Sequence, residues 1–217
     1  MKLYSVDLSP YAARVRISVY AKGLPVEIVA PPADGIKSDG YRALNPMARI
    51  PVLVRGDGTA IPESETIVEY LEDAFPDPAL RPESPEARAK VRLIARVAEL
   101  YVLEPVLSLF GQLDPSVRNP AVVQSGLTRL GEGLEYLEGF MADGLYAAGA
   151  SLTTADGAVT PALFFVNVVL GGLDALELMS GHTRLNAHVQ TAKRHKVLGR
   201  VIGEMADGMQ TLRRRQS

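Results

Sequence analysis

A serine, a proline and a tyrosine, Ser9-Pro10-Tyr11, lie where a short apolar run gives way to a helical pattern. Serine is a preferred N-cap because its hydroxyl accepts a hydrogen bond from an early helical N–H group, and proline suits the first helical position. The remaining N–H groups and the positive end of the helix dipole would face an anion placed above them. Ser9 is therefore either a simple helix cap or the binding group for a thiolate or carboxylate.

The sequence has no cysteine, so it contains no disulfide, no thiolate metal site and no cysteine nucleophile. Any thiol chemistry at Ser9 must use a thiol that a ligand brings in. The three histidines, His182, His188 and His195, do not form the closely spaced pair typical of a metal site. We expect surface or packing roles for them and predict no metal site.

The composition is that of an ordinary globular protein, with 47% hydrophobic and 22% charged residues. A net charge of -2 argues against a nucleic-acid-binding protein. We find no apolar run of the ~18 residues that a membrane span needs, and the N-terminal residues form a strand pattern instead of a signal peptide. We therefore expect a cytoplasmic protein with neither a nucleic-acid partner nor a membrane partner.

The elements that must position Ser9 begin with a strand, a helix and a second strand between residues 2 and 30. This order predicts a parallel pair of strands joined by a right-handed crossover. Two further strands flank the turn signal Asp57-Gly58, and Ser64 begins another helix. Residues 1–75 are thus predicted to form a small α/β domain with a mixed four-stranded sheet.

A proline-rich linker, residues 76–84, follows this domain, and residues 85–217 have helical patterns throughout. Apolar residues recur on two sides of the stretch 86–110, so we expect a long helix with two packing partners. Pro105 lacks a backbone donor and predicts a kink or break in this helix. The second predicted domain is therefore all-helical.

This order of domains and three local motifs resemble a cytosolic glutathione transferase over nearly the whole chain. Ser9-Pro10-Tyr11 with Arg14-Val15-Arg16 resembles the segment that carries the catalytic hydroxyl in the serine-type classes tau, zeta and theta. Arg49-Ile50-Pro51-Val52-Leu53 resembles the family's Val-Pro-x-Leu segment, in which the proline is cis. Glu63-Ser64 with Ile67-Val68-Glu69-Tyr70-Leu71 resembles the segment that grips the γ-glutamyl group, and Thr153 to Asp156 resembles the family's capping box.

The resemblance implies a thioredoxin-like N-terminal domain that binds glutathione and an all-α C-terminal domain. It also implies that the Ser9 hydroxyl donates a hydrogen bond to the glutathione sulfur and stabilises the thiolate. Tyr11 is the second candidate for this hydroxyl, because a tyrosine has this role in other classes of the family. Glutathione would be the co-substrate, and no metal would be needed.

The remaining contacts to glutathione follow from the other two motifs. The resemblance implies that Ser64 binds the γ-glutamyl carboxylate and that Glu63 faces the α-amino group. The Ile50 backbone, before Pro51, would pair with the extended peptide. Arg49 stands where the zeta-like pattern has glutamine, and we predict that Lys37 or Arg49 supplies charge for the glycyl end.

The implied reaction is conjugation of the glutathione thiolate to a small hydrophobic electrophile, as in detoxification. We expect the second substrate in a pocket lined by Tyr11, Tyr101, Pro105, Leu109 and Phe110. One alternative is a glutathione-dependent cis-trans isomerase of the zeta type with a maleyl-acid substrate, although the chain lacks the zeta Ser-Ser-Cys run. The other is a non-catalytic binding protein with the same fold.

The two apolar faces of the stretch 86–110, together with the resemblance, predict a homodimer.

Overall fold

The computed structural model describes the chain from Met1 to Gln216, with side chains described as far as Arg214. Its contacts divide the chain into two units. The first comprises Met1–Leu80 and the last helix, α9 (Lys196–Gln216), and the second comprises Arg81–His195. The expected helical domain of residues 85–217 therefore differs from the second unit by α9, which packs against a helix of the first unit.

The first unit is built on a four-stranded sheet with the strand order β2-β1-β3-β4. Its strands are β1 (Lys2–Tyr4), β2 (Glu27–Val29), β3 (Val52–Val54) and β4 (Ala60–Pro62). β1 runs parallel to β2, with Leu3 opposite Ile28, and antiparallel to β3, with Leu3 opposite Leu53. β3 and β4 are also antiparallel, so the predicted mixed sheet is confirmed.

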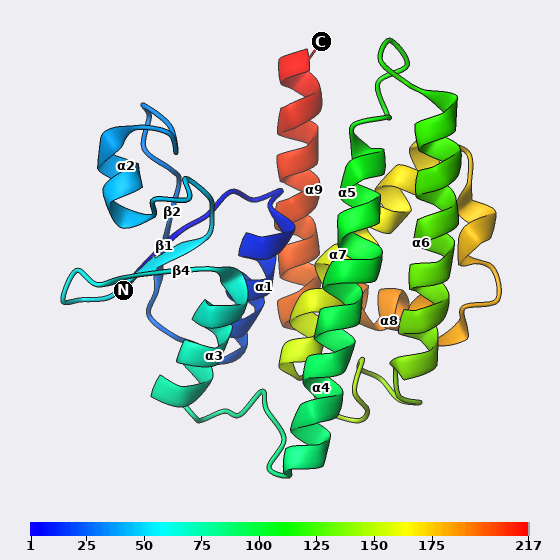
Figure 1. Cartoon of the computed structure of the whole chain (residues 1–217). Coiled ribbons are helices and arrows are strands. Elements are labelled where there is room, and N and C mark those ends of the chain that lie inside the picture. Colours follow the sequence, from blue (N-terminus) through cyan, green and yellow to red (C-terminus); the bar gives the residue numbers. More distant parts are fainter. Residues whose placement is uncertain (217) are drawn as a thin grey trace. The chain divides into compact units, whose positions relative to one another are not determined.

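Three helices and α9 accompany this sheet. α1 (Pro10–Ala21) connects β1 to β2, α2 (Asp39–Leu44) precedes β3, and α3 (Ser64–Ala74) follows β4. α1 contacts both α3 and α9, and Figure 1 shows these three helices next to one another. The core of the unit is a cluster of fully buried apolar side chains that come from the sheet, α1 and α3, among them Leu3, Val15, Leu53, Ile67 and Leu71.

The second unit contains helices α4 (Pro85–Val97), α5 (Glu104–Phe110), α6 (Pro120–Phe140), α7 (Thr154–Gly172) and α8 (Thr183–Arg194). A π-helical segment, η1 (Ala98–Leu103), joins α4 to α5, and a short 3-10 helix, η2 (Leu176–Met179), precedes α8. The predicted break in the stretch 86–110 is present, but it begins at Ala98 and Pro105 lies in the first turn of α5.

Two features explain this early break. Pro105 has no N–H group to donate to the carbonyl of Tyr101, four residues earlier, and the amide of Glu104 donates instead to the carbonyl of Glu99, five residues earlier. Helix α6 packs closely against the same turn. A Cβ atom at Gly133 would lie 1.8 Å from the carbonyl oxygen of Tyr101, so only glycine fits there.

Helix α7 is long and apolar enough to cross a membrane, but 72% of its most apolar window is buried inside the protein. It contacts α4, η1, α5 and α8, as expected for the central helix of a helical domain. The predicted box at its start is present, because the Thr153 amide donates to the Asp156 carboxylate over 2.8 Å.

Candidate active site

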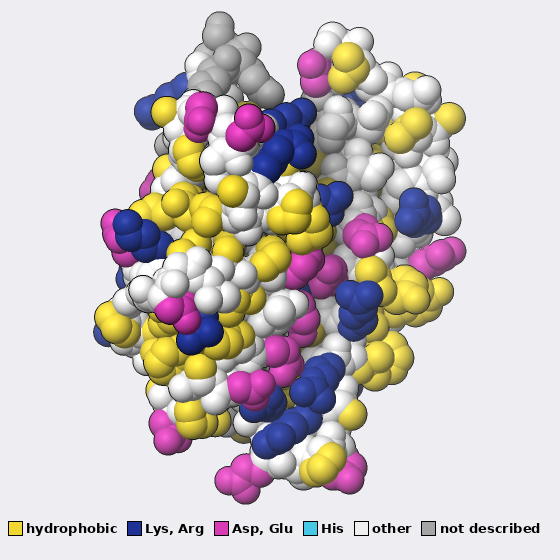
Figure 2. Space-filling model, turned by 60° about the vertical axis from the view of Figure 1, so that its left-hand side comes forward, with side chains coloured by type: hydrophobic (Ala, Val, Ile, Leu, Met, Phe, Trp, Pro, Cys, Tyr) yellow, Lys and Arg dark blue, Asp and Glu magenta, His cyan; other side chains and the backbone are white. Residues whose placement is uncertain are grey.

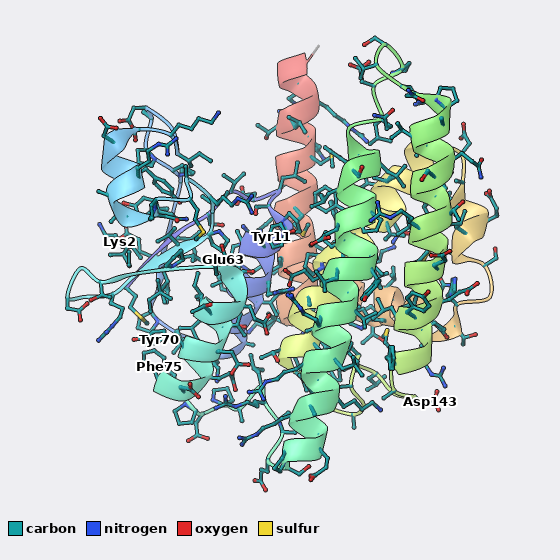
Figure 3. The ribbon with its side chains drawn as sticks, in the orientation of Figure 1. Lys2, Tyr11, Glu63, Tyr70, Phe75 and Asp143 are labelled. Carbon is teal, nitrogen blue, oxygen red and sulfur yellow. The ribbon has the colours of Figure 1, made fainter. Side chains whose placement is uncertain are left out.

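Ser9 caps α1 through its side chain. Its Oγ accepts a hydrogen bond from the Ala12 amide at 3.2 Å, and its carbonyl accepts one from the Ala13 amide at 2.9 Å. Pro10 occupies the first helical position, as predicted. Because the hydroxyl acts as an acceptor toward Ala12, its own proton remains to be donated to a ligand. Capping and thiolate binding are therefore compatible at this residue. Tyr11, labelled in Figure 3 at the start of α1, is half-buried.

Ser64 begins α3, and its side chain is 6% exposed. Among the described residues, no group forms a hydrogen bond with its hydroxyl. The first helical bond runs from the Ile67 amide to the Glu63 carbonyl, at 2.9 Å. The amides of Ser64, Glu65 and Thr66 therefore have no acceptor within the helix.

Glu63, labelled in Figure 3 at the start of α3, is exposed and has φ 67 and ψ 120. A non-glycine residue with positive φ of this kind carries strain of roughly 1–3 kcal/mol, and such residues gather at ligand sites. This backbone conformation places Glu63 directly before the first helical residue, Ser64.

Ile50 and Pro51 are joined by a cis peptide bond, as the resemblance implies. The preceding carbonyl, that of Arg49, accepts hydrogen bonds from the Tyr41 hydroxyl and the Asn45 side-chain amide, both at 2.9 Å. Burial, with a smaller contribution from Tyr4, raises the pKa of Tyr41 to about 12, so the phenol remains a donor. The Ile50 backbone forms no hydrogen bond with the described residues and is therefore open to an extended peptide.

Arg14 connects the two helix starts. Its side chain is buried, and its Nη1 lies 2.7 Å from Glu65 Oε2 in the first turn of α3. The sequence patterns indicated no role for Arg14, Tyr41 or Asn45. Arg14 belongs to the Arg14-Val15-Arg16 motif, so the sequence contained a signal that could have identified it. Tyr41 and Asn45 lie in no such motif, and nothing in the neighbouring sequence shows that both bind the Arg49 carbonyl.

Two family models match this chain: the N-terminal domain of glutathione S-transferase over residues 3–79, and its C-terminal domain over residues 120–191. The mouse protein named maleylacetoacetate isomerase is 34% identical over 170 residues, which are 73% of this chain and 74% of that protein. The chain belongs to the glutathione S-transferase family. A rice protein named "Probable glutathione S-transferase GSTU6" is 36% identical over 179 residues, 79% of this chain and 70% of that protein.

The fold agrees with this membership. The crystal structure of Gtt2 from Saccharomyces cerevisiae superimposes with a TM-score of 0.77 at 25% identity, covering 93% of this chain and all of that one. The four-stranded mixed sheet with its helices is the thioredoxin-like domain of a glutathione S-transferase, and the second unit supplies its helical domain.

The two candidates for the glycyl end of glutathione, Lys37 and Arg49, are both exposed on the first unit. The Lys37 carbonyl accepts a hydrogen bond from Arg42 Nε at 3.1 Å, which places Lys37 just before α2. Arg49 follows Ala48, whose φ is 52, and precedes the cis bond. The choice between these two side chains stays a prediction.

The residues predicted to contact the second substrate have different environments. Pro105 and Leu109 of α5 are buried, and the Leu109 side chain packs against Gly126 of α6. Both side chains pack in the core of the second unit, and their contact with a second substrate stays a prediction. Phe110 packs edge to face against Phe165, with ring centroids 5.3 Å apart, and Tyr101 is 48% exposed.

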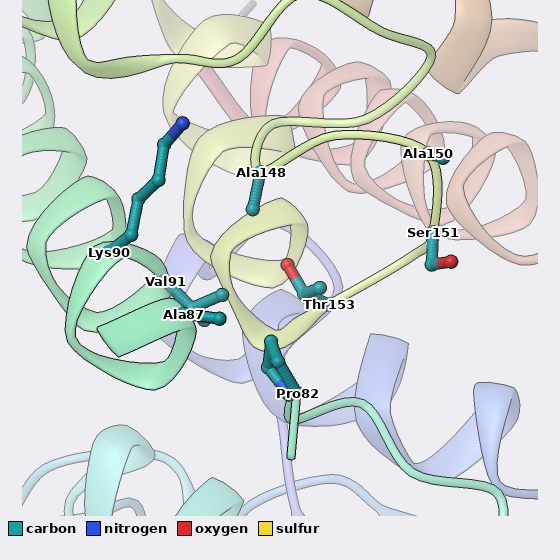
Figure 4. A pocket seen from close by; sticks show the side chains of 8 residues that line it. All are labelled: Pro82, Ala87, Lys90, Val91, Ala148, Ala150, Ser151 and Thr153. Carbon is teal, nitrogen blue, oxygen red and sulfur yellow. The ribbon is translucent and has the colours of Figure 1, made fainter. Parts of the chain in front are cut away.

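The second unit also contains a cavity of about 190 Å³ between α4 and the segment before α7 (Figure 4). Most of its lining residues are small or apolar, and the polar ones are Lys90, Ser151 and Thr153. The Thr153 hydroxyl donates to Asp156 at 3.1 Å. None of the predicted glutathione contacts lies here. Among the described residues, no group of three or more His, Asp or Glu side chains is arranged to hold a metal ion.

Proposed function

We propose that this chain is a glutathione transferase in which Ser9 activates the thiol. The observation that carries the proposal is the Ser9 hydroxyl at the start of α1, which accepts from Ala12 and keeps a proton to donate. That hydrogen bond and the helix dipole would favour the thiolate over the thiol. A free thiol has a pKa of ~8.5, and sites of this kind lower it toward or below neutrality.

Glutathione would be held at the second helix start. The Ser64 hydroxyl and the unpaired amides of α3 would bind the γ-glutamyl carboxylate, and Glu63 would bind the α-amino group. The open backbone of Ile50 would pair with the peptide. The thiolate sulfur then forms a bond to a carbon of the electrophile, and the leaving group departs with the electron pair of the broken bond.

A second candidate reaction is a glutathione-dependent cis-trans isomerisation, which the likeness to the mouse maleylacetoacetate isomerase favours. In that reaction the thiolate adds to a conjugated double bond, the adduct rotates, and the thiolate leaves again. Ser9 would have the same role. Incubation with a maleyl acid separates the two reactions, because isomerisation returns all of the glutathione whereas conjugation consumes it.

The test is the variant Ser9→Ala. The thiol pKa of bound glutathione should rise, as followed by thiolate absorbance near ~240 nm and by the pH at which turnover increases. Loss of one charge-assisted hydrogen bond is worth about 1.5–3 kcal/mol, so kcat/KM near neutral pH should fall about ten- to a hundredfold.

The matched control is Ser84→Ala. Ser84 precedes Pro85 and caps α4 with the same bond, from the Ala87 amide to Oγ at 3.1 Å. Each variant should lose about 0.5–2 kcal/mol of stability as a helix cap. If both changed only stability, Ser9 would be a cap and Tyr11→Phe would be the next variant. A wild-type protein that is not retained on a glutathione column would favour a non-catalytic member of the family.

We also propose a homodimer. Leu93, Tyr101, Tyr136 and Phe140 of the second unit are 43% to 48% exposed, and Tyr101 stacks edge to face on Tyr136. Apolar side chains gathered on α4, η1 and α6 are typical of a surface that a second copy covers. Light scattering at micromolar concentration should give the dimer mass, and a monomer mass would contradict the proposal.

The partners that we propose are therefore glutathione, a small hydrophobic electrophile and a second copy of the chain. Figure 2 shows Lys and Arg side chains interspersed with Asp and Glu on the face that it presents, in keeping with the net charge of -2. We propose no nucleic-acid partner, as the net charge of -2 indicates. The resemblance to cytosolic members of the family supports action in the cytoplasm.

A further inference from the structure

A fully buried arginine lies behind the loop that leads from β1 to Ser9. The Arg16 side chain, in the second turn of α1, is 0% exposed. Its Nη1 donates to Ser5 Oγ at 2.7 Å and to the Val6 carbonyl at 3.1 Å, and its Nη2 donates to the Asp7 carbonyl at 2.7 Å. One rigid guanidinium group therefore holds three successive residues of this loop.

The same loop fixes the position of Ser9. The Val6 carbonyl, which accepts from Arg16, also accepts the Ser9 amide at 3.0 Å. Arg16 and Ser9 thus share one acceptor, so a shift of the Val6 carbonyl would also disturb the hydrogen bond that holds the Ser9 backbone. The Ser9 hydroxyl must be placed to a fraction of an ångström to donate to a sulfur atom.

Helix α9 supplies the charge that compensates Arg16. Arg16 Nε and Glu204 Oε2 form an ion pair at 2.9 Å, and Asp7 Oδ1 lies 3.9 Å from Nη1. Glu204 is itself held by the Tyr20 hydroxyl and by Arg200 Nε, both at 3.0 Å. A buried guanidinium without such a partner would be strongly destabilising, so α9 makes the buried position of Arg16 tolerable.

The same helix also contacts the loop backbone directly. A Cβ atom at Gly208, one turn beyond Glu204, would lie 2.8 Å from the Leu8 amide nitrogen and 3.1 Å from Leu8 Cβ. The glycine therefore lets α9 approach the residue that immediately precedes Ser9. Any larger side chain there would displace the backbone of the loop.

We propose that Arg16, supported by Glu204 and Gly208 of α9, is a positioning residue for the Ser9 hydroxyl. This inference rests on the proposed function of Ser9. Arg16 does not contact the thiol; it sets the place of the loop from which Ser9 begins α1. The last helix of the chain would then influence thiol activation through the Ser5–Leu8 loop, although it contributes no group to the thiol.

The first test compares Arg16→Met with Lys22→Met. Lys22 is a cation with an equally buried side chain directly after the end of α1, and it pairs with Glu72 at 2.8 Å and donates to the Phe75 and Pro78 carbonyls. Both variants should be less stable. Only Arg16→Met should raise the thiol pKa of bound glutathione, by about one unit, which lowers kcat about tenfold at pH values below the wild-type thiol pKa and less at neutral pH. This kcat should recover at high pH, where the thiol ionises unaided.

The second test needs no buried charge to be removed. Gly208→Ala should shift the loop and raise the same thiol pKa. Gly203→Ala on the same helix adds a Cβ that meets nothing within 4 Å, so it should keep the wild-type pKa and kcat. Comparing Gly208→Ala with Gly203→Ala therefore tests whether the loop positions Ser9 even if Arg16→Met does not fold.

The outcomes separate the inference from the proposed function. If Ser9→Ala raises the thiol pKa but Arg16→Met and Gly208→Ala match their controls per folded molecule, the positioning role is wrong and the role of Ser9 stands. If bound glutathione in the wild-type protein shows no lowered thiol pKa and Ser9→Ala leaves that pKa unchanged, then the positioning role of Arg16 and the proposed role of Ser9 are both wrong. A raised thiol pKa in Arg16→Met or Gly208→Ala, absent from the controls, supports the inference.

Discussion

His188 should make the protein sensitive to mild acid. It is buried on α8, where its Nε2 lies 3.0 Å from Thr160 Oγ1 and its Nδ1 lies 3.6 Å from Asp156 Oδ1. Among the residues that the structure describes, Nδ1 has no hydrogen-bond partner. Burial lowers the pKa of His188 from 6.5 to about 4, because the protonated ring would lose its hydration. The variant His188→Gln removes this titration and keeps an amide that can reach Thr160.

The direction of the effect follows from the two pKa values. Between pH 6.5 and about 4 the unfolded chain binds a proton at His188 that the folded protein does not, so the free energy of unfolding falls as the pH falls. The stabilisation by the neutral ring is complete above 6.5 and is lost toward 4. At ~1.36 kcal/mol per pKa unit, the wild-type protein should lose about 3 kcal/mol more than His188→Gln over this range.

Asp156 acts in the opposite direction. Burial raises its pKa to about 6, although the Ala147 and Thr153 donors oppose this shift. Its folded pKa lies above the unfolded one, so its contribution to stability is present at low pH and is lost as the pH rises through about 6. The wild-type profile alone would mix the two groups, and the difference between wild type and His188→Gln reports the histidine together with its interaction with Asp156, 3.6 Å away.

The assay is urea unfolding from pH 7.5 to 4 at one fixed protein concentration. His188→Gln should be the less stable protein at pH 7.5, and the two free energies should converge on acidification. Thr160→Val is the control: it removes the hydrogen-bond partner but keeps the ring, so its pH profile should stay parallel to wild type. Parallel profiles for wild type and His188→Gln would refute the argument.

Two further predictions test the site and the packing. Ser64→Ala should raise the KM for glutathione more than it lowers kcat, because Ser64 would contact the ligand equally in the ground and transition states; steady-state kinetics with unchanged KM and collapsed kcat would contradict its role. Gly133→Ala should lower the melting temperature severely, since its Cβ would lie 1.8 Å from the Tyr101 carbonyl, whereas Gly139→Ala on the same helix meets nothing within 4 Å and should be neutral or stabilising. Equal melting temperatures for these two variants would show that α6 can move away from η1.

The sequence by itself determined the elements and the helix starts, because the signals for these are local. Ser9 before Pro10 caps α1, Ser64 begins α3, and the Thr153 amide bonds to Asp156, as the residue types and spacings indicate. Strand, helix, strand and hairpin in that order leave few topologies, and the mixed sheet is among them. The capping bond at Ser9 was therefore predictable.

Packing between distant residues decided what the sequence could not. Pro105 predicted a break, but the π-helical segment begins at Ala98 because the turn must accommodate both the missing N–H of Pro105 and the close approach of Gly133. Leu109 has the apolar character of a pocket residue and of a core residue alike. Only its contact with α6 shows that it is core.

The support of Ser9 depends on tertiary structure alone. The sequence shows Arg16 as part of the Arg14-Val15-Arg16 motif. Nothing in the neighbouring sequence shows that its counter-charge, Glu204, lies in the last helix. Local patterns predicted that this stretch is helical, and only the folded chain shows that it packs against α1. Caps and periodicities act over a few residues and are visible in the sequence, whereas a buried ion pair needs the folded chain to bring its two charges together.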